Sequence, residues 1–474
     1  MKKILATFIL LTAITITGCA GTNGGNNGES PAASNGGGEK QPDSIIQTLA
    51  KEYIQPEMKG EITISTLDEW EFINEGAKLF MDKYPDVKVT VNTFRIVETI
   101  KLEGGAEMSG TPSEEFSTEN YLNLLNTKIM TGKAEDIIMT DPIPLRKYTE
   151  MGAFEDLSFF LSNSPEINEE SHYMNVFEIM KDKNGRLYKI PLTCQPPEII
   201  SFNKTLVEDS GLFLDDSIKK MSHKEAVEHA KKLVDSTNRD NTFLTLGNSG
   251  IHTAFGVIND SFEEFVDEEN KKVDINNERF INILKWAKDL EAQGYYDTQQ
   301  TIDFYNMEYY FALDNDFSTQ AAYYSLRPDT ERYHPIPQSD ASGNVGATAY
   351  PCFGINSSSS NKELSWEFIK FLLSEEFQTL PSVFGLGVNK KGFDANVERN
   401  LKMYNEGGQT NIDKQEYEGL IKEWMSQING YSRTDPTIIN ELMYPELIKF
   451  FKEGQPAEDT AEILQSKLDK YLNE

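Results

Sequence analysis

Hydrophobic residues recur in two rhythms in the part of the chain that follows residue 60. Ile62 and Ile64 alternate with polar residues, which predicts a strand over 61–67, and alternating valines predict another over 87–91. Between these strands, apolar residues recur at three- and four-residue steps and mark one face of a helix: Trp70, Ile73, Ala77, Phe80 and Tyr84. Pro85 is expected to end that helix.

A third strand is predicted further along the chain, over the apolar residues Ile137–Met139. Strand–helix–strand order is typical of a parallel sheet with right-handed crossovers, so we expect an α/β fold. Such sheets place ligands in a crevice at the carboxyl ends of their strands. Later helices are predicted from apolar faces over 280–290, 364–372 and 461–471, and Gly294 is expected to end the first of these.

The first residues show a different pattern. Lys2 and Lys3 precede an apolar run over 4–16. This run is shorter than a transmembrane helix requires, and a basic start followed by such a run is typical of an export signal. The run leads to Gly18 and Cys19, a sequence that resembles the bacterial lipobox, so we expect cleavage after residue 18 and lipidation of Cys19. The alternative is a plain cleaved signal with a chance cysteine. Residues 20–44 are rich in Gly, Asn and Ser and are expected to form a flexible tether.

Composition and charge narrow the class of protein. The chain has 474 residues, 38% of them hydrophobic, which is enough for two sizeable lobes. Its formal net charge of −31 argues against a nucleic-acid partner, because phosphate contacts need a basic surface. After the N-terminal segment there is no run of 18 apolar residues, so no further membrane span is expected.

Five segments in this order resemble the family 1 extracellular solute-binding proteins of ABC importers, the group that includes maltose-binding protein and Gram-positive sugar-binding lipoproteins. Residues 61–91 resemble the family's opening strand, helix and second strand, and 128–161 resemble its third-strand region. Residues 184–211 carry a Gly-x-x-Tyr-x-x-Pro run followed by Asn-Lys, and 353–378 and 451–474 are similar to the last two family segments. Residues 94–117 depart from the family pattern and are interpreted as a surface insertion.

The resemblance implies a two-lobed periplasmic-binding-protein fold of type II, with discontinuous lobes joined by crossing strands. We expect lobe 1 to comprise 60–192 and 317–348, and lobe 2 to comprise 196–315 and 353–474, with 19–59 as the lipidated tether. The expected crossings are Pro191–Pro197, Asn315–Phe317 and Thr348–Phe353. Such lobes close on a solute because the solute binds the closed state better than the open one.

The function that the resemblance implies is capture without turnover. We expect a small solute, in the first place an oligosaccharide, to be delivered to ABC transporter permease subunits from the outer face of a Gram-positive cell membrane. We expect a monomer that needs no cofactor. Peptide, polyamine and other non-sugar solutes remain alternatives, because one fold hosts many ligands. A secreted glycan-active enzyme or a surface adhesin is a further alternative.

Candidate ligand contacts follow the predicted first and third strands. Asp68, Glu69 and Trp70 come directly after the first strand, and Asp141 comes after the third. Carboxylates can accept hydrogen bonds from sugar hydroxyls, and an aromatic face can cover the apolar side of a sugar ring. The alternative is structural, with Asp68 capping the helix, Trp70 in the core and Asp141 capping a turn.

Other candidates lie in the crossing strands and the second lobe. Gln195 is expected at the floor of the cleft, and Asn248 lies in a Gly-Asn-Ser-Gly turn. Tyr323, Tyr324 and Arg327 follow a strand predicted over 319–322, where family likeness places an aromatic platform; the alternative is a half-buried strand of aromatic residues. Three further candidates precede the last family segment: Arg433, Asn440 and Tyr444. Trp286, Trp366 and Trp424 fall inside helical patterns and are expected in the core.

The remaining chemistry-bearing residues form no recognisable catalytic or metal motif. His223 and His229 are six residues apart and fall on different helix faces, and no His-Glu-x-x-His, Gly-x-Ser-x-Gly or EF-hand spacing occurs. We therefore expect no metal site and no enzyme. Cys194 and Cys352 fall in two expected crossing segments, and a bridge between them would restrain a hinge, so free, buried thiols are expected.

Overall fold

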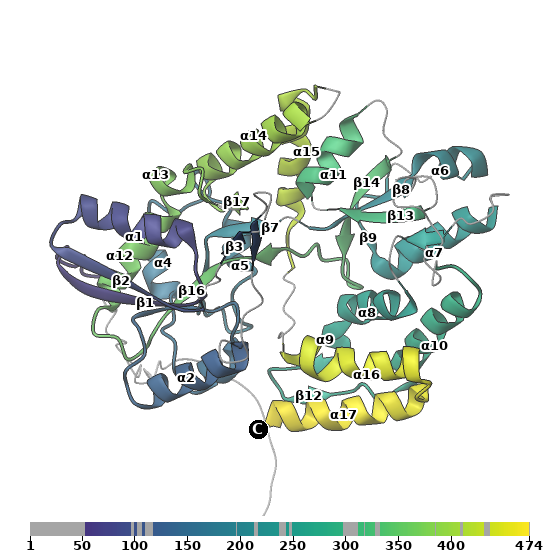
Figure 1. Cartoon of the computed structure of the whole chain (residues 1–474), viewed down its shortest axis with the longest axis horizontal. Coiled ribbons are helices and arrows are strands. Elements are labelled where there is room, and N and C mark those ends of the chain that lie inside the picture. Colours follow the sequence, from purple (N-terminus) through teal and green to yellow (C-terminus); the bar gives the residue numbers. More distant parts are fainter. Residues whose placement is uncertain are drawn as a thin grey trace, which may run out of the picture. The chain divides into compact units, whose positions relative to one another are not determined.

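The computed structural model is an α/β structure built on two five-stranded sheets (Figure 1). The structure describes residues 53–473, except 96–98, 102–106, 110–116, 196, 213–216, 237–242, 246–248, 297–310, 317, 328–331, 384, 408–410 and 431–436. Residues 1–52, which include Cys19 and the expected tether, lie outside this part of the chain.

The first sheet has the strand order β2-β1-β5-β16-β6. Its strands are β1 (Gly60–Asp68), β2 (Val87–Arg95), β5 (Ile137–Met139), β16 (Cys352–Ile355) and β6 (Ile190–Pro191). Strand β1 runs parallel to β2 and β5, which confirms the predicted parallel arrangement, whereas β16 runs antiparallel to β5 and β6. Because β1 and β2 are parallel and fully in register, they end together with Asp68 opposite Arg95.

The second sheet has the order β10-β13-β8-β14-β9 and is also mixed. Its strands are β8 (Ile199–Asn203), β9 (Met221–Ser222), β10 (Phe243–Thr245), β13 (Phe311–Asp316) and β14 (Arg332–Ser339). Strand β8 pairs antiparallel with both β13 and β14. A hairpin outside this sheet is formed by β11 (Val266–Asp267) and β12 (Lys272–Val273).

A small third sheet connects the two large ones along the chain (Figure 1). Strand β7 (Thr193–Gln195) follows β6 and precedes β8, while β15 (Thr348–Ala349) follows β14 and precedes β16. Both β15 and β17 (Leu386–Gly387) pair antiparallel with β7. The chain therefore passes between the large sheets in two of the segments where crossings were expected, 191–197 and 348–353.

Strand pairing assigns the returning segments differently from the expected lobe boundaries. Strand β14, placed in lobe 1 by the sequence, pairs with β8 in the second sheet. Strand β16, placed in lobe 2, pairs with β5 in the first sheet. Asn315, expected in a crossing, pairs with Ile200 inside the second sheet. An antiparallel return strand carries no period-2 or period-3.6 signal that says which sheet it joins, which is why the sequence misassigned these segments.

Several helices share one large apolar core with the first sheet and the small third sheet. They are α1 (Glu71–Lys83), α4 (Ser158–Ser162), α5 (Met174–Glu178), α11 (Ser318–Leu326), α12 (Lys362–Leu373), α13 (Glu375–Gln378), α14 (Lys390–Gly407) and α15 (Lys414–Gln427). Trp366 is fully buried and donates from Nε1 to Ser164 Oγ at 2.9 Å, and Trp424 is buried as well, so both are core residues as expected. A smaller apolar cluster adds α2 (Thr118–Met130) and α3 (Leu145–Glu150).

The second sheet and the C-terminal helices form two further apolar clusters. Their helices are α6 (Lys204–Ser210), α7 (His223–Ser236), α8 (Gly250–Asp260), α9 (Phe262–Phe265), α10 (Glu278–Ala292), η3 (Ile438–Met443), α16 (Tyr444–Ile448), η4 (Lys449–Glu453) and α17 (Ala457–Asn473). The predicted helices over 280–290, 364–372 and 461–471 are confirmed within α10, α12 and α17. Gly294 adopts a φ of 83° just after α10, which suits its predicted role as a stop signal.

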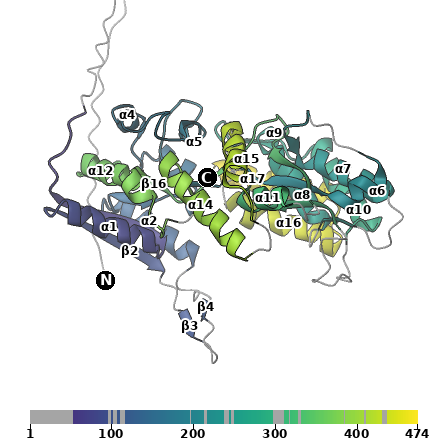
Figure 2. The ribbon, with the colours of Figure 1, turned by 90° about the horizontal axis from the view of Figure 1, so that it is seen from above.

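Two sequence predictions about local structure are wrong. Residues 319–322 lie in helix α11 and not in a strand. The segment interpreted as an insertion from residue 94 begins later, because Phe94 and Arg95 complete β2. The described part of the insertion includes a two-stranded hairpin of β3 (Thr99–Lys101) and β4 (Glu107–Ser109), which extends beyond the first sheet in Figure 2.

Tyr53, at the start of the described chain, packs against helices α4 and α12. Its hydroxyl donates to Glu367 of α12 at 2.6 Å, and its ring packs 6.3 Å and 6.0 Å from Phe159 and Phe160. Lys370 lies 5.9 Å from the same ring. The chain therefore joins the folded part at α4 and α12.

Cys194 and Cys352 are free, buried thiols, which confirms the expectation. Burial raises the pKa of Cys194 to about 12, so its reactive thiolate form is scarce at neutral pH. In protein carrying Cys19→Ser, we expect no thiol to react in the native state and two to react after denaturation without reductant. An Ellman titration measures both values, and fewer than two thiols in denatured protein would show that the two cysteines form a bridge.

Candidate functional site

Polar and aromatic side chains gather where β1, β2 and β5 end. We call this group the edge cluster and define it as Asp68, Trp70, Arg95, Asp141 and Tyr350. It forms because parallel strands bring their carboxyl ends to one edge of a sheet, the place where such folds hold ligands. The sequence predicted three of its members, and the fold adds Arg95 and Tyr350.

Asp68 and Arg95 form a bidentate ion pair at this edge. Both nitrogens of the fork, Nε and Nη2, donate to the two carboxylate oxygens, with Nη2 2.7 Å from Oδ2. The side chains are 31% and 20% exposed, so solvent screens the pair only in part. Asp68 does not cap helix α1, because the N-cap position is Trp70 and no side chain bonds there. Its carboxylate is thus held in a fixed orientation.

Trp70 and Tyr350 form an aromatic pair beside the two charged residues. Their ring centroids lie 5.3 Å apart at an angle of 71°, and the Phe72 ring lies 5.5 Å from that of Trp70 at an angle of 69°. The indole Nε1 of Trp70 is buried and has no acceptor among the described residues. A buried donor without a partner costs free energy, so this nitrogen would gain from an acceptor supplied by a ligand.

Tyr350 is linked to the crossing strand β7 and to the charges of the cluster. Its backbone N–H donates to Thr193 O at 3.0 Å, and its carbonyl accepts from the Thr193 hydroxyl. Burial raises the pKa of Tyr350 to about 12, the carboxylates of Asp141 and Asp68 add to the rise, and Arg95 opposes it. The charges of Asp68, Arg95 and Asp141 therefore all act on the Tyr350 hydroxyl.

Asp141 closes the cluster from the end of β5. Its Oδ2 accepts a hydrogen bond from the backbone N–H of Cys352 at 2.8 Å. Burial raises the pKa of Asp141 to about 6, although the Cys352 N–H and the Lys189 ammonium both favour the ionised form. Asp141 is therefore a carboxylate whose charge is only partly compensated by the protein, and it would be stabilised by further hydroxyl donors.

The other predicted contacts lie in separate places. Glu69 is exposed next to the edge cluster. Gln195 lies on β7 opposite Thr348 and is partly exposed, two residues from Thr193 and hence on the same face of the strand. Asn248 and Arg433 lie outside the described residues.

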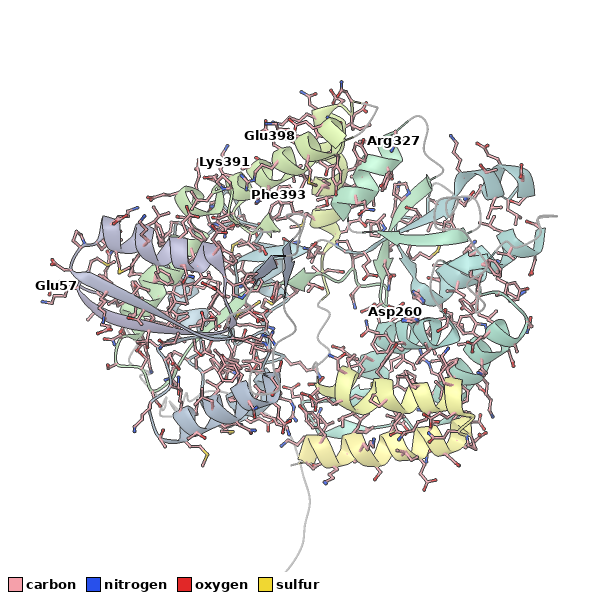
Figure 3. The ribbon with its side chains drawn as sticks, in the orientation of Figure 1. Glu57, Asp260, Arg327, Lys391, Phe393 and Glu398 are labelled. Carbon is pink, nitrogen blue, oxygen red and sulfur yellow. The ribbon has the colours of Figure 1, made fainter. Side chains whose placement is uncertain are left out.

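The aromatic group of α11 packs largely against the core. Tyr323 is 3% exposed and stacks on Tyr404, with centroids 4.8 Å apart and an angle of 23°. Arg327 directly follows α11 (Figure 3), and its guanidinium lies 5.8 Å from the ring of Tyr323 and 5.9 Å from that of Tyr324. Tyr324 is the more exposed of the two rings and the better placed to meet a ligand.

Asn440 and Tyr444 lie among the C-terminal helices. Asn440 is exposed on η3, whereas Tyr444 packs edge-on against Phe255 and near His252, both on α8, at 6.4 Å in each case. Helix α8 begins two residues after Asn248. Tyr444 therefore contacts α8 and not the edge cluster.

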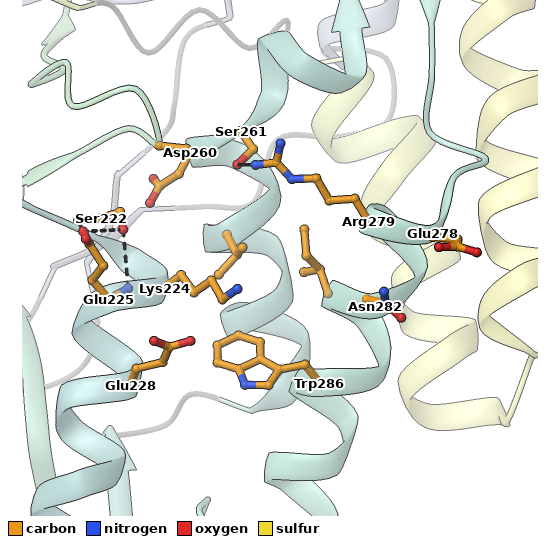
Figure 4. Close-up of a pocket in the computed structure, with 13 residues that line it drawn as sticks. Ser222, Lys224, Glu225, Glu228, Asp260, Ser261, Glu278, Arg279, Asn282 and Trp286 are labelled. Atoms are coloured by element: carbon orange, nitrogen blue, oxygen red, sulfur yellow. Dashed lines mark hydrogen bonds between the residues drawn. The ribbon is translucent and has the colours of Figure 1, made fainter.

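A separate surface cavity of about 890 Å³ opens between α7, α8 and α10 (Figure 4). No predicted contact lines it, but Trp286 does, so this residue is only partly buried and not fully in the core as expected. Asp260 at its rim accepts from His223 N at 2.7 Å and from Gln338 Nε2 at 3.1 Å, and burial raises the pKa of Asp260 to about 7. None of the predicted contacts lines this cavity, whereas three of them belong to the edge cluster, so we place the candidate site at the edge cluster.

The described residues bear on two alternative kinds of protein, a metalloprotein and a membrane-spanning protein. They contain no group of three or more His, Cys, Asp or Glu side chains placed to hold a metal ion. Within the same residues, no helix combines the length and apolar character needed to cross a bilayer.

Several solved structures share this fold. A periplasmic oligogalacturonide binding protein from Yersinia enterocolitica matches with a TM-score of 0.57 and 17% identity, over 87% of this chain and 99% of that one. The sugar-binding protein MalE from Xanthomonas citri matches with 0.58 and 13%, over 87% and 98%. The ABC substrate-binding protein Lmo0181 from Listeria monocytogenes, solved with cycloalternan, matches with 0.52 and 15%, over 88% and 99%. At these identities the likeness shows the fold, which is the two-lobed periplasmic-binding-protein fold that the sequence predicted.

The sequence itself also matches a family. No curated protein matches it significantly. A family model described as bacterial extracellular solute-binding protein matches residues 65–379, which is more than half of the chain. Its members bind solutes and are not enzymes, and they act outside the cytoplasm, in agreement with the sequence predictions. The chain therefore belongs to the bacterial extracellular solute-binding proteins, the family that serves ABC importers.

Proposed function

We propose that this protein captures an oligosaccharide at the edge cluster and delivers it to the permease of an ABC importer, while a lipid on Cys19 holds it at the outer face of the membrane. The observation that carries the solute class is the Trp70–Tyr350 pair beside two carboxylates. Aromatic faces suit the apolar sides of sugar rings, and carboxylates suit their hydroxyls. The solved structures named above include proteins that bind an oligogalacturonide and cycloalternan, which supports the same class.

The Asp68–Arg95 pair favours a neutral sugar over other solute classes. The guanidinium already shares two hydrogen bonds with Asp68, so the pair carries no net charge. Both residues keep further donors and acceptors, because a carboxylate has about four acceptor sites and a guanidinium five donors. Such a pair can bond several hydroxyls at once without demanding an ion. The Asp141 carboxylate lies outside this pair and is the group that a polyamine would meet, so a ligand screen must separate a polyamine from a sugar.

A thermal-shift screen tests this proposal. Neutral oligosaccharides, uronates, peptides and polyamines are added in turn to Cys19→Ser protein, and melting is followed by fluorescence. A solute at 100 times its Kd stabilises the folded state by about 2.7 kcal/mol, so the correct class should raise Tm by several degrees. Chromatography of the recovered sugar should show it unaltered. A shift with a peptide or polyamine and none with any sugar would refute the proposed solute class.

The affinity for sugar is expected to fall as the pH drops from about 6 to 4. The raised pKa of Asp141, about 6 in the free protein, means that protonation competes with hydroxyl donation to its carboxylate. Bound hydroxyls favour the ionised form and lower this pKa, so binding releases a proton within that window. The affinity should fall by up to about tenfold for each pH unit below about 6, and it should stay constant above pH 7. Calorimetry in buffers of different ionisation enthalpy measures the released proton.

Asp141→Asn serves as the control for this pH dependence. The amide keeps an oxygen that accepts from Cys352 N–H but does not titrate. Its affinity should be lower than that of the wild type at pH 8 and nearly independent of pH between 4 and 8. An unchanged slope in this variant would assign the titration to another group.

A further inference from the structure

Charged side chains join the two lobes at a place separate from the crossing strands. On the first lobe they come from α3 and from the turn 182–186 ahead of β6; on the second they come from the hairpin of β11 and β12. Lys271 Nζ lies 3.0 Å from Glu150 Oε2. Lys183 Nζ lies 3.5 Å from Asp267 Oδ1 and 3.4 Å from Glu269 Oε2. We call these side chains the interlobe contact.

Two further interactions reinforce it. Asn184 Nδ2 donates to Glu269 Oε1 at 3.4 Å. Lys147 of α3 places its Nζ 4.0 Å from the ring centroid of Tyr471, a cation–π distance. Tyr471 belongs to α17, the helix that packs on β12. The interlobe contact thus joins α3 and the turn 182–186 of the first lobe to the β11–β12 hairpin and α17 of the second lobe.

Local backbone structure holds the partners in place. Among the described non-glycine residues, Lys271 alone has a positive φ, 53°, a conformation that L-residues seldom adopt. On the other side, the Asp182 carboxylate closes the turn 182–186 by accepting from the backbone N–H groups of Asn184 and Arg186, each at 2.9 Å. Because both ends are preorganised, the pairs lose less side-chain entropy when they form.

The position and exposure of the interlobe contact decide what it can do. The turn 182–186 precedes the amino end of β6, and Ala153, three residues after the end of α3, bonds Ser357 beyond the carboxyl end of β16, so the contact lies toward the edge of the first sheet opposite the edge cluster. Lys183 is 55% exposed and Lys271 38% exposed, so salt screens both strongly. An interaction of this kind can adjust an equilibrium between lobe positions but cannot fix it.

We propose that the interlobe contact is a salt-sensitive latch that favours the arrangement of the lobes in which it forms, in the absence of solute. The inference goes beyond the proposed function, because it concerns the lobe equilibrium whatever the solute is. Each exposed ion pair changes such an equilibrium by about two- to fivefold, and two together by about tenfold. The apparent affinity for a solute scales with the fraction of molecules in the binding-competent arrangement, so the latch also tunes binding.

Distance measurement between the lobes tests the latch without any solute. Nitroxide labels are placed in the Cys19→Ser chain at Met151→Cys, 59% exposed after α3, and at Lys272→Cys, exposed on the hairpin. Cys194 and Cys352 are fully buried and should not label. Pulsed dipolar spectroscopy should show the longer-distance population rise about five- to tenfold relative to the shorter one in Lys183→Glu/Lys271→Glu. Raising salt from 0.05 to 1 M should act in the same direction in the wild type.

Matched variants separate the latch from a general effect of charge. Lys59→Glu/Lys402→Glu makes the same charge change at two exposed lysines that pair locally, and it should leave the distances unchanged. Adding Glu150→Lys to Lys271→Glu should restore most of the shorter-distance population. Distances that do not respond to the interlobe variant or to salt, or that respond equally to the control, would overturn the proposal. Because no ligand is present, a negative solute screen would leave this result intact.

Discussion

Replacing Asp68 with alanine is expected to weaken solute binding about 100-fold, which corresponds to about 2.7 kcal/mol. The change removes two acceptor oxygens at the carboxyl end of β1 and leaves the Arg95 guanidinium, 20% exposed, without its partner. Hydrogen bonds to a charged group contribute about 1.5–3 kcal/mol each, so the loss of one or two explains this magnitude. Isothermal titration with the sugar found by the screen measures it, and circular dichroism reports whether the fold is kept.

The partner substitution makes this test specific. Arg95→Met should weaken binding about tenfold, because Asp68 keeps its oxygens but loses the fork that orients them. In Asp68→Ala/Arg95→Met, affinity should be no lower than in Asp68→Ala alone, since both changes act on one unit. Independent, additive losses would show that Arg95 contacts the solute in its own right. Wild-type affinity in Asp68→Ala would remove the edge cluster from the binding site.

Trp366→Ala should lower the free energy of unfolding by about 3–5 kcal/mol, the largest effect on stability that we expect from one substitution. The side chain is fully buried in the core of the first sheet, packs 5.6 Å from Phe160 and bonds Ser164 through Nε1. Truncation leaves a cavity and removes the hydrogen bond that the Ser164 hydroxyl accepts, although this hydroxyl still donates to Phe160 O. Urea denaturation followed by circular dichroism gives the difference.

Trp366→Phe is the matched control for that loss. It keeps most of the ring volume and removes mainly the bond to Ser164, so a cost of about 1–2 kcal/mol is expected. Trp286→Phe, at the partly exposed cavity, should cost less still. If Trp366→Ala cost no more than Trp286→Phe, the core around α12 would not be packed as described.

The fold was largely accessible from the sequence, because hydrophobic periodicity reports which face of an element is buried. Strand β5 was predicted with its observed bounds, and α1, α10, α12 and α17 were found from their apolar faces. Residues 319–322 of α11 were mistaken for a strand, although Gln320, Ala321 and Ala322 favour a helix and only Thr319 favours a strand. Which sheet receives β14 and β16 depends on long-range pairing that local patterns do not encode.

The edge cluster could be predicted in part, because hydrophobic periodicity shows where strands end. Asp68, Trp70 and Asp141 follow strands whose ends the pattern predicts, so their nearness follows from a parallel sheet. Arg95 was missed because β2 was predicted to end at Val91, although β1 and β2 have equal length and finish opposite each other. Tyr350 enters the cluster through the pairing of β15 with β7, about 155 residues apart in sequence, which no local signal predicts. The remaining proposed contacts, such as Gln195 and Tyr324, stay predictions.

The attachment of Tyr53 to α4 and α12 has a mechanical consequence for a protein held by its N-terminus. Any anchor ahead of Tyr53 pulls on the lobe that carries the edge cluster, and the load reaches the other lobe through the elements that join the two, which include the small three-stranded sheet and the interlobe contact. The first lobe would then stay within the reach of the tether from the bilayer, while the second lobe moves relative to it during each cycle of capture and release.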